Sequence, residues 1–271
     1  MEATVAKILV GFDHSPSSTV ALEKGLQLAK RMGAELHIVY VEATGHFLDW
    51  DSVHDYVAGL RRDTGMQITE HHKKGKAYRE IVHTEKEIGA DLILVGTHGI
   101  EGFTPFWIGS TAYRVVSSSK CPVITVQENS EDLDFSQILL PLDSTPETRQ
   151  KLPWAALLAK KFHSTIHILC VSKDKDDDTL QHLRVYAAQT EEYLATRGIR
   201  FTTETRAGAN IAQECIKYSR ETHCGLVMMM TETEPSGMFM GTVAQQLINH
   251  CPIPVMAIHN RVVVGVIGGG Y

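Results

Sequence analysis

Short runs of apolar residues alternate along the chain with longer stretches in which apolar residues recur every three or four positions. The first run covers residues 8–12, and residues 15–29 follow it with helical spacing, where Ser15 and Pro16 suit the cap and first turn of a helix. Strands that are apolar throughout are typical of a parallel sheet covered on both faces. The same alternation predicts strands at 36–41, 66–70, 92–95 and 123–126, and helices at 52–62, 78–88 and 110–118.

The whole pattern occurs twice. Residues 7–30 and 137–160 share their order of residue types and match Asp13 with Asp143, a shift of 143 − 13 = 130 residues. A repeat of that length is a domain rather than a solenoid unit. We therefore expect an α/β protein with two tandem, doubly wound, Rossmann-like domains, each a parallel sheet of about five strands flanked by helices. The second copy predicts strands near residues 138, 166, 201, 226 and 255.

An acidic segment interrupts the alternation between the two copies and marks the domain boundary. We assign residues 1–127 to the first domain, 128–136 to a linker and 137–271 to the second domain. A second charged run, at 173–178, follows a predicted strand of the second copy. We interpret it as a solvated loop, with an acidic metal-binding loop as the alternative.

Composition narrows the classes of partner. The 271 residues are 43% hydrophobic and carry a formal net charge of −6, which gives no basic footprint for nucleic acid or an anionic membrane surface. The apolar tail at 262–267 is far shorter than the twenty or so residues of a membrane span. Five cysteines, an odd number without a Cys-x-x-Cys pair, favour a reducing compartment. We therefore expect a cytoplasmic protein with neither nucleic-acid nor membrane partners.

Candidate chemistry lies just after the fourth predicted strand. Gly96, Gly99 and Gly109 punctuate the segment that leads into the next helix, and Ser110 and Thr111 open that helix. Glycines let the main chain approach an anion, and a helix N-terminus offers free N–H groups and a positive dipole. This arrangement predicts a site for a phosphorylated ligand.

The spacing Gly96-x2-Gly99-x9-Gly109-Ser110, with residues 7–13 and 39–41, resembles the ATP-binding subclass of the universal stress proteins. The resemblance covers nearly the whole chain and implies an adenine-nucleotide α-hydrolase-like fold that binds ATP, with Mg²⁺ held through the nucleotide. It implies that Asp13 and Val41 flank adenine and ribose, that Gly96 and Gly99 line the phosphates, and that Gly109, Ser110 and Thr111 cap the phosphate end. The expected nucleotide-binding residues are Gly11, Phe12, Asp13, Val41, Gly96, Thr97, His98, Gly99, Gly109, Ser110 and Thr111.

Some features leave alternatives open. Ile100 and Glu101 follow the second glycine, where family members often have a basic or small residue. The glycines could serve only the tight connection between strand and helix. His98 could donate to a phosphate oxygen or could be an ordinary loop histidine with partners of its own.

The second copy lacks the permissive positions of this motif. Met230 stands where the first copy has Gly96, Thr233 stands where it has Gly99, and Glu232 and Glu234 add negative charge. We therefore predict that the second domain does not hold ATP. This domain is either a scaffold, in which 228–230 is a buried strand with a loop packed on it, or it has an adaptable apolar pocket. The residues that could line such a pocket are Met228, Met229, Met230, Met238, Phe239 and Met240.

No hydrolase, P-loop or metalloprotease motif occurs in the sequence. We interpret the protein as a regulatory, stress-survival module that binds ATP in its first domain and acts on an unknown protein partner. Two alternatives are a slow ATP hydrolase and a nucleotide-free family member that binds proteins or small apolar ligands. Single-domain members of the family that the chain resembles dimerise through their last strands. The resemblance therefore implies that strands at 123–126 and 255–258 pair within the chain as an internal pseudo-dimer, whose free edges would allow a homodimer.

Overall fold

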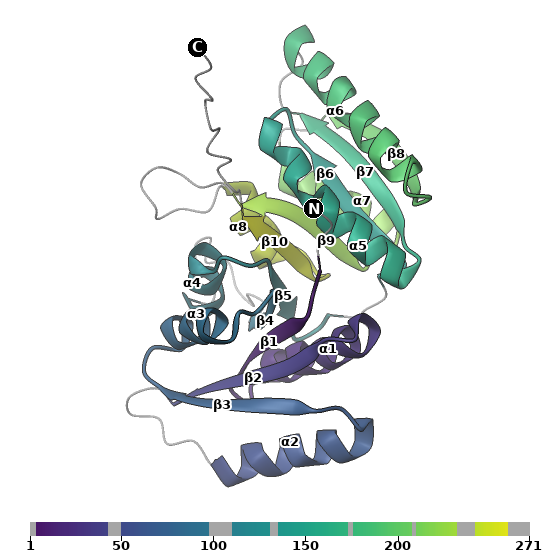
Figure 1. The fold of residues 1–271 in the computed structure, drawn as a ribbon. Helices are drawn as coiled ribbons and strands as arrows, with labels where there is room; N and C mark the ends of the chain where they lie inside the picture. Colours follow the sequence, from purple (N-terminus) through teal and green to yellow (C-terminus); the bar gives the residue numbers. More distant parts are fainter. Residues whose placement is uncertain are drawn as a thin grey trace, which may run out of the picture.

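The computed structural model describes residues 4–42, 50–97, 110–130, 135–172, 176–207, 210–231 and 242–259, and strands alternate with helices along them (Figure 1). The first unit contains β1 (Lys7–Phe12), α1 (Pro16–Met32), β2 (Glu35–Glu42), α2 (Trp50–Thr64), β3 (Ile68–Lys74), α3 (Ala77–Ile88), β4 (Leu92–Thr97), α4 (Ser110–Ser118) and β5 (Val123–Gln127). The second unit contains β6 (Gln137–Leu142), the 3-10 helix η1 (Pro146–Lys151), α5 (Leu152–Phe162), β7 (Thr165–Ser172), α6 (Asp177–Ala195), β8 (Arg200–Ala207), α7 (Ile211–Glu221), β9 (Leu226–Thr231), α8 (Thr242–His250) and β10 (Val255–His259).

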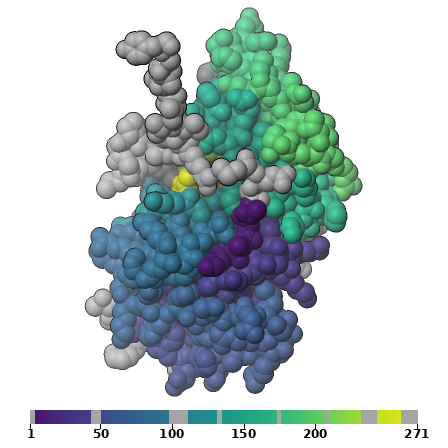
Figure 2. Space-filling view, viewed as in Figure 1, coloured from purple at the N-terminus to yellow at the C-terminus, as the bar shows by residue number. Residues whose placement is uncertain are grey.

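The strands of the described residues form one sheet of ten, in the order β3-β2-β1-β4-β5-β10-β9-β6-β7-β8. Pairing is parallel within each unit, and the two units join where β5 and β10 run antiparallel, with Ile124 opposite Met256. The predicted α/β class and the predicted pairing of the two final strands are confirmed. The units form two lobes of the molecule, purple to blue and teal to green in Figure 2.

Helices cover both faces of the sheet and bury two apolar layers. One layer contains side chains of α1, α2, α5 and α6, and the other contains side chains of α3, α4, α7 and α8. On β1, Ile8 and Val10 enter the first layer while Leu9 enters the second, because successive side chains of a strand point to opposite faces. This two-sided burial explains why the central strands are apolar throughout.

The cap predicted for α1 is present. Ser15 Oγ accepts a hydrogen bond from the N–H of Ser18 (3.2 Å), and Pro16 occupies the first turn. The helix ends at Gly33, whose φ of 71° lies in the left-handed region that favours glycine. The corresponding helix of the second unit ends at His163, which adopts the same conformation with a φ of 55°.

Two elements differ from the sequence prediction. We expected the third strand at 66–70, but β3 runs to Lys74 because its polar second half pairs through the main chain with β2, His71 opposite Val39. In the second unit, the helix expected after β6 begins as the 3-10 helix η1. Pro153 has no N–H to bond to the carbonyl of Arg149, so a continuous α-helix would lose a hydrogen bond there.

Candidate functional site

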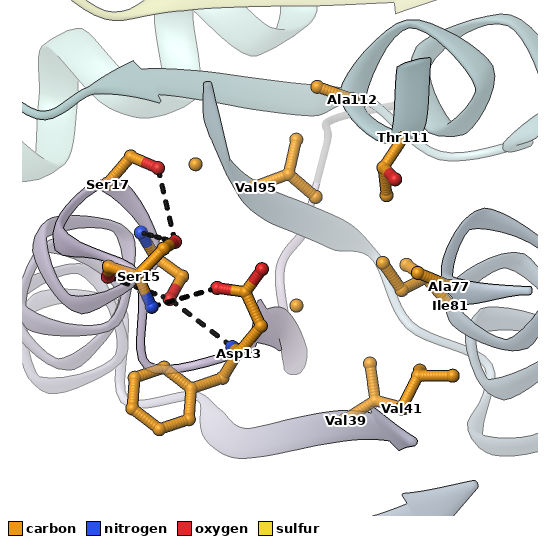
Figure 3. A pocket seen from close by; sticks show the side chains of 14 residues that line it. Asp13, Ser15, Ser17, Val39, Val41, Ala77, Ile81, Val95, Thr111 and Ala112 are labelled. Carbon is orange, nitrogen blue, oxygen red and sulfur yellow. Dashed lines mark hydrogen bonds between the residues drawn. The ribbon is translucent and has the colours of Figure 1, made fainter. Parts of the chain in front are cut away.

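The first unit has a pocket of about 290 Å³ where β1, β2 and β4 end. Parallel α/β sheets bind their ligands at this edge. Figure 3 shows Asp13, Ser15 and Ser17 on one side of the pocket, with Ile81 and Thr111 on the other. The lining residues are Gly11, Phe12, Asp13, Ser15, Ser17, Ser18, Val39, Val41, Ala77, Ile81, Val95, Gly96, Thr111 and Ala112.

Hydrogen bonds fix the turn that forms the polar side of this pocket. The Asp13 carboxylate accepts from the N–H of Ser15 (3.0 Å), and the Ser18 hydroxyl accepts from the N–H of Asp13 (3.3 Å). Between them, His14 has a φ of 62°, a left-handed conformation that is uncommon outside glycine. The side chain of Asp13 is thereby positioned before any ligand arrives.

The opposite wall of the pocket is apolar. Val39 and Val41 lie on the same face of β2, two residues apart, and Ile81 of α3 packs with them in one apolar layer. All three side chains are buried. Such a wall can bind a flat or aliphatic part of a ligand, while the α1 side offers hydroxyl and carboxylate oxygens.

Gly96 lies where the first turn of α1 rests closely on β4. A Cβ atom on this glycine would lie 2.5 Å from the carbonyl carbon of Ser17 and 2.6 Å from the nitrogen of Ser18. Real Cβ atoms do not approach backbone atoms so closely, so only glycine lets the first turn of α1 rest on the strand. Gly96 therefore lines the pocket and also allows Ser17 and Ser18 to lie against β4.

Several predicted site residues are brought together, and others are not. Among the described lining residues are the predicted Gly11, Phe12, Asp13, Val41, Gly96 and Thr111. Thr97 is absent from that lining, because it is buried and its hydroxyl donates to the carbonyl of Val126 (3.3 Å). His98, Gly99 and Gly109 lie outside the described residues, as does the side chain of Ser110, which begins α4.

Sequence reasoning missed other parts of the lining. Ser17 and Ser18 are buried although serine is usually exposed, and nothing in the local pattern indicates that they face β4. Val39 could have been found, because strand alternation places it on the face of Val41. Ala77 and Ile81 come from α3, and only the tertiary structure places that helix at the pocket.

The second unit has its own pocket, of about 350 Å³, beside the ends of β6 and β9. The turn after β6 repeats that of the first unit: the Asp143 carboxylate accepts from the N–H of Thr145 (2.8 Å), and the Thr148 hydroxyl accepts from the N–H of Asp143 (3.2 Å). Met230 lines this pocket at the position of Gly96. A side chain at Gly96 would meet the backbone of α1, so the approach that α1 makes to β4 cannot be repeated in the same form at Met230.

Few of the described residues around the first pocket are ionisable. Among its described lining residues, Asp13 alone has an ionisable side chain. In the second pocket, burial raises the pKa of the Cys215 thiol to about 12, so this cysteine is neutral and unreactive near pH 7.

Within the described parts of the chain, no three His, Cys, Asp or Glu side chains are grouped to hold a metal ion. No helix there has both the length and the apolar character needed to cross a membrane.

Comparisons with known proteins agree with the repeated architecture. The model of the universal stress protein family matches residues 4–127 and again 134–259. Universal stress protein YxiE of Bacillus subtilis is 32% identical over 145 residues, covering 45% of this chain and 98% of that protein. A universal stress protein of Methanocaldococcus jannaschii is 27% identical over 143 residues, covering 46% and 84%. The crystal structure of a universal stress protein from Archaeoglobus fulgidus aligns with a TM-score of 0.73 at 20% identity, over 94% of this chain and 98% of that one.

Proposed function

Since the chain belongs to the universal stress protein family, we propose that it is an ATP-responsive module whose first unit binds the nucleotide and whose second unit does not. The observation that carries the proposal is the pocket of the first unit. It joins the fixed turn at Asp13, the apolar wall at Val39 and Val41, and the start of α4 at Thr111. Nucleotide occupancy would then set the affinity for a protein partner during stress.

The pocket has the division of chemistry that an adenine nucleotide requires. The adenine ring would lie against Val41 and Ile81, and the ribose hydroxyls would donate to the Asp13 carboxylate. The phosphates would extend toward Thr111, at the first turn of α4, where N–H groups and the helix dipole favour negative charge. Mg²⁺ would arrive with the phosphates, and the glycine motif that continues from Gly96 supports the same end of the ligand.

Loss of the glycine position supports the assignment of ATP to one unit. Met230 places a long thioether side chain in the wall where the first unit has no side chain at all. Glu147 also lines the second pocket, where the first unit has Ser17, and a carboxylate there repels a triphosphate. We infer that the second unit acts through another ligand or as a scaffold.

We favour binding over hydrolysis. A hydrolase needs a general base that activates water near the γ-phosphate. Asp13 is the one ionisable side chain among the described lining residues, and its carboxylate already accepts a hydrogen bond from Ser15. A phosphate-release assay on the purified protein should therefore show turnover far below that of dedicated ATPases.

A thermal-shift experiment with Mg-ATP tests the proposal. Ligand at one hundred times Kd stabilises a one-site binder by about 2.7 kcal/mol, which raises the melting temperature measurably. Ala77→Phe fills the first pocket and should abolish the shift, whereas Ile211→Phe, in the second pocket, should leave it intact. Equal responses from the two variants would contradict the assignment of ATP to the first unit.

A further inference from the structure

A buried lysine lies in the pocket of the second unit. Lys151, at the end of η1, is only 2% exposed, and it lines the pocket with Asp143 and Cys215. Its Nζ donates to the hydroxyl of Thr148 (3.2 Å). Lysine is almost never buried to this degree without a counter-ion, so its position requires a physical explanation.

At the position equivalent to Lys151, the first unit has no charged side chain, and its own buried lysine, Lys24, lies one turn further along α1. The shift of 130 residues that relates Asp13 to Asp143 also relates Ala21 to Lys151, and Ala21 is fully buried. The second unit therefore has an ammonium group where the first has a methyl group. The turns that precede Ala21 and Lys151 have the same hydrogen bonds. The lysine therefore changes the lining of the pocket and leaves the fold of the turn unchanged.

Among the described residues, the ammonium group of Lys151 is incompletely paired. It has three N–H donors, and among the described residues Thr148 is its one hydrogen-bond acceptor and no carboxylate lies within 4.0 Å. Burial lowers its pKa to about 8, while the charge of Asp143 acts in the opposite direction. The lysine is thus mostly protonated near pH 7 and has donors left for an anion.

The other lining residues limit what that anion can be. Asp143 and Glu147 add negative charge to the lining, which disfavours a ligand with several negative charges. The remaining wall is apolar and includes Met229, Met230 and Leu247. One buried positive charge beside methionine and leucine side chains matches a ligand with one negative charge and a hydrocarbon body.

We propose that the pocket of the second unit binds a monocarboxylate with an apolar body, such as a medium-chain fatty acid or an aryl carboxylate. The carboxylate accepts hydrogen bonds from Lys151, and the hydrocarbon part packs against Met229 and Met230. A volume of about 350 Å³ suits a small ligand of this kind. The inference does not depend on ATP binding in the first unit.

Calorimetric titration of the full-length protein with octanoate tests the proposal, with octan-1-ol and inorganic phosphate as comparison ligands. Octanoate should bind at one site, and Lys151→Met should weaken it at least tenfold, because methionine keeps the bulk of the side chain and removes the charge. Lys161→Met removes an exposed lysine of α5 and should leave the affinity unchanged. Octan-1-ol should bind weakly and equally to all three proteins.

A pH series on the unmodified protein gives a second readout that does not depend on the folding of a variant. Octanoate affinity should fall as the pH rises from 7 through about 8 to 9, because Lys151 loses the proton that makes it a cation. Three results would overturn the proposal. They are an octanoate affinity that is unchanged by both Lys151→Met and pH, the absence of octanoate binding, and tighter binding of inorganic phosphate than of octanoate. Repeating the titration with Ala77→Phe separates it from the nucleotide site, since that variant should bind octanoate normally.

Discussion

The contact between Gly96 and the first turn of α1 makes a prediction that can be worked from the structure. The added methyl of Gly96→Ala would lie 2.5 Å from the carbonyl carbon of Ser17 and 2.7 Å from its oxygen. Normal contacts of this kind are about 3.4 Å or more, so either α1 or β4 must move by close to 1 Å. The neighbours are backbone atoms, which cannot rotate away.

The net cost combines two opposing effects. Overpacking of this kind costs about 1–3 kcal/mol, and the reduced freedom of the unfolded chain returns about 0.4–1 kcal/mol. We therefore expect Gly96→Ala to lower the free energy of unfolding by about 1–2 kcal/mol. Because Ser17 and Ser18 line the pocket, displacement of α1 should also weaken the Mg-ATP thermal shift.

Denaturant unfolding with a matched glycine variant provides the measurement. Gly59 lies within α2, and its added Cβ would meet no atom closer than the end of Arg62 at 4.0 Å. Gly59→Ala should therefore stabilise the protein by about 0.5–1 kcal/mol. If Gly96→Ala were as stable as Gly59→Ala and bound Mg-ATP normally, the close approach of α1 to β4 would not be what requires the glycine.

Two further predictions concern stability. Burial lowers the pKa of His71, His167 and His259 below 6.5, and the charge of His37 adds to the effect at His71. As the pH falls, these histidines therefore bind protons in the unfolded chain at a higher pH than in the folded protein. In denaturant titrations, the free energy of unfolding should be highest above about pH 6.5 and should fall toward pH 5. An equal free energy of unfolding above pH 6.5 and at pH 5 would refute this prediction. Glu85 Oε1 accepts from the N–H groups of residues 120 and 121 (2.7 and 3.0 Å), so Glu85→Ala should cost about 2–3 kcal/mol. An unchanged unfolding midpoint would show that water replaces those bonds.

Most of the fold could be predicted from the sequence because the signals that determine it are local and repeated. Apolar strands alternate with amphipathic helices twice, and the pairing of β5 with β10 was expected from the family resemblance, although the antiparallel direction of that pairing comes from the structure. The end of β3 could not be predicted, because residues 71–74 are polar and pair only through main-chain bonds. The 3-10 start at η1 was not expected, although Pro153 removes an N–H that a continuous α-helix would use.

Part of the lining of the candidate site could be predicted from the sequence. Thr111 opens the helix that follows the glycine segment, whereas Asp13 was expected from the family resemblance, and both line the pocket at the sheet edge where parallel α/β units bind ligands. The contribution of Ile81 depends on how α3 packs, which its own periodicity does not reveal. Lys151 was missed for the same reason, since a lysine at this spacing looks like an ordinary exposed residue until the pocket is seen.

A crystal structure of the protein with Mg-ATP would test the central claim most directly, because it shows each unit separately. The account predicts nucleotide density in the first unit alone, with adenine against Val41 and phosphates at the start of α4, and a second pocket without nucleotide beside Met230. Density for ATP in the second unit, or in neither unit at saturating concentration, would contradict it.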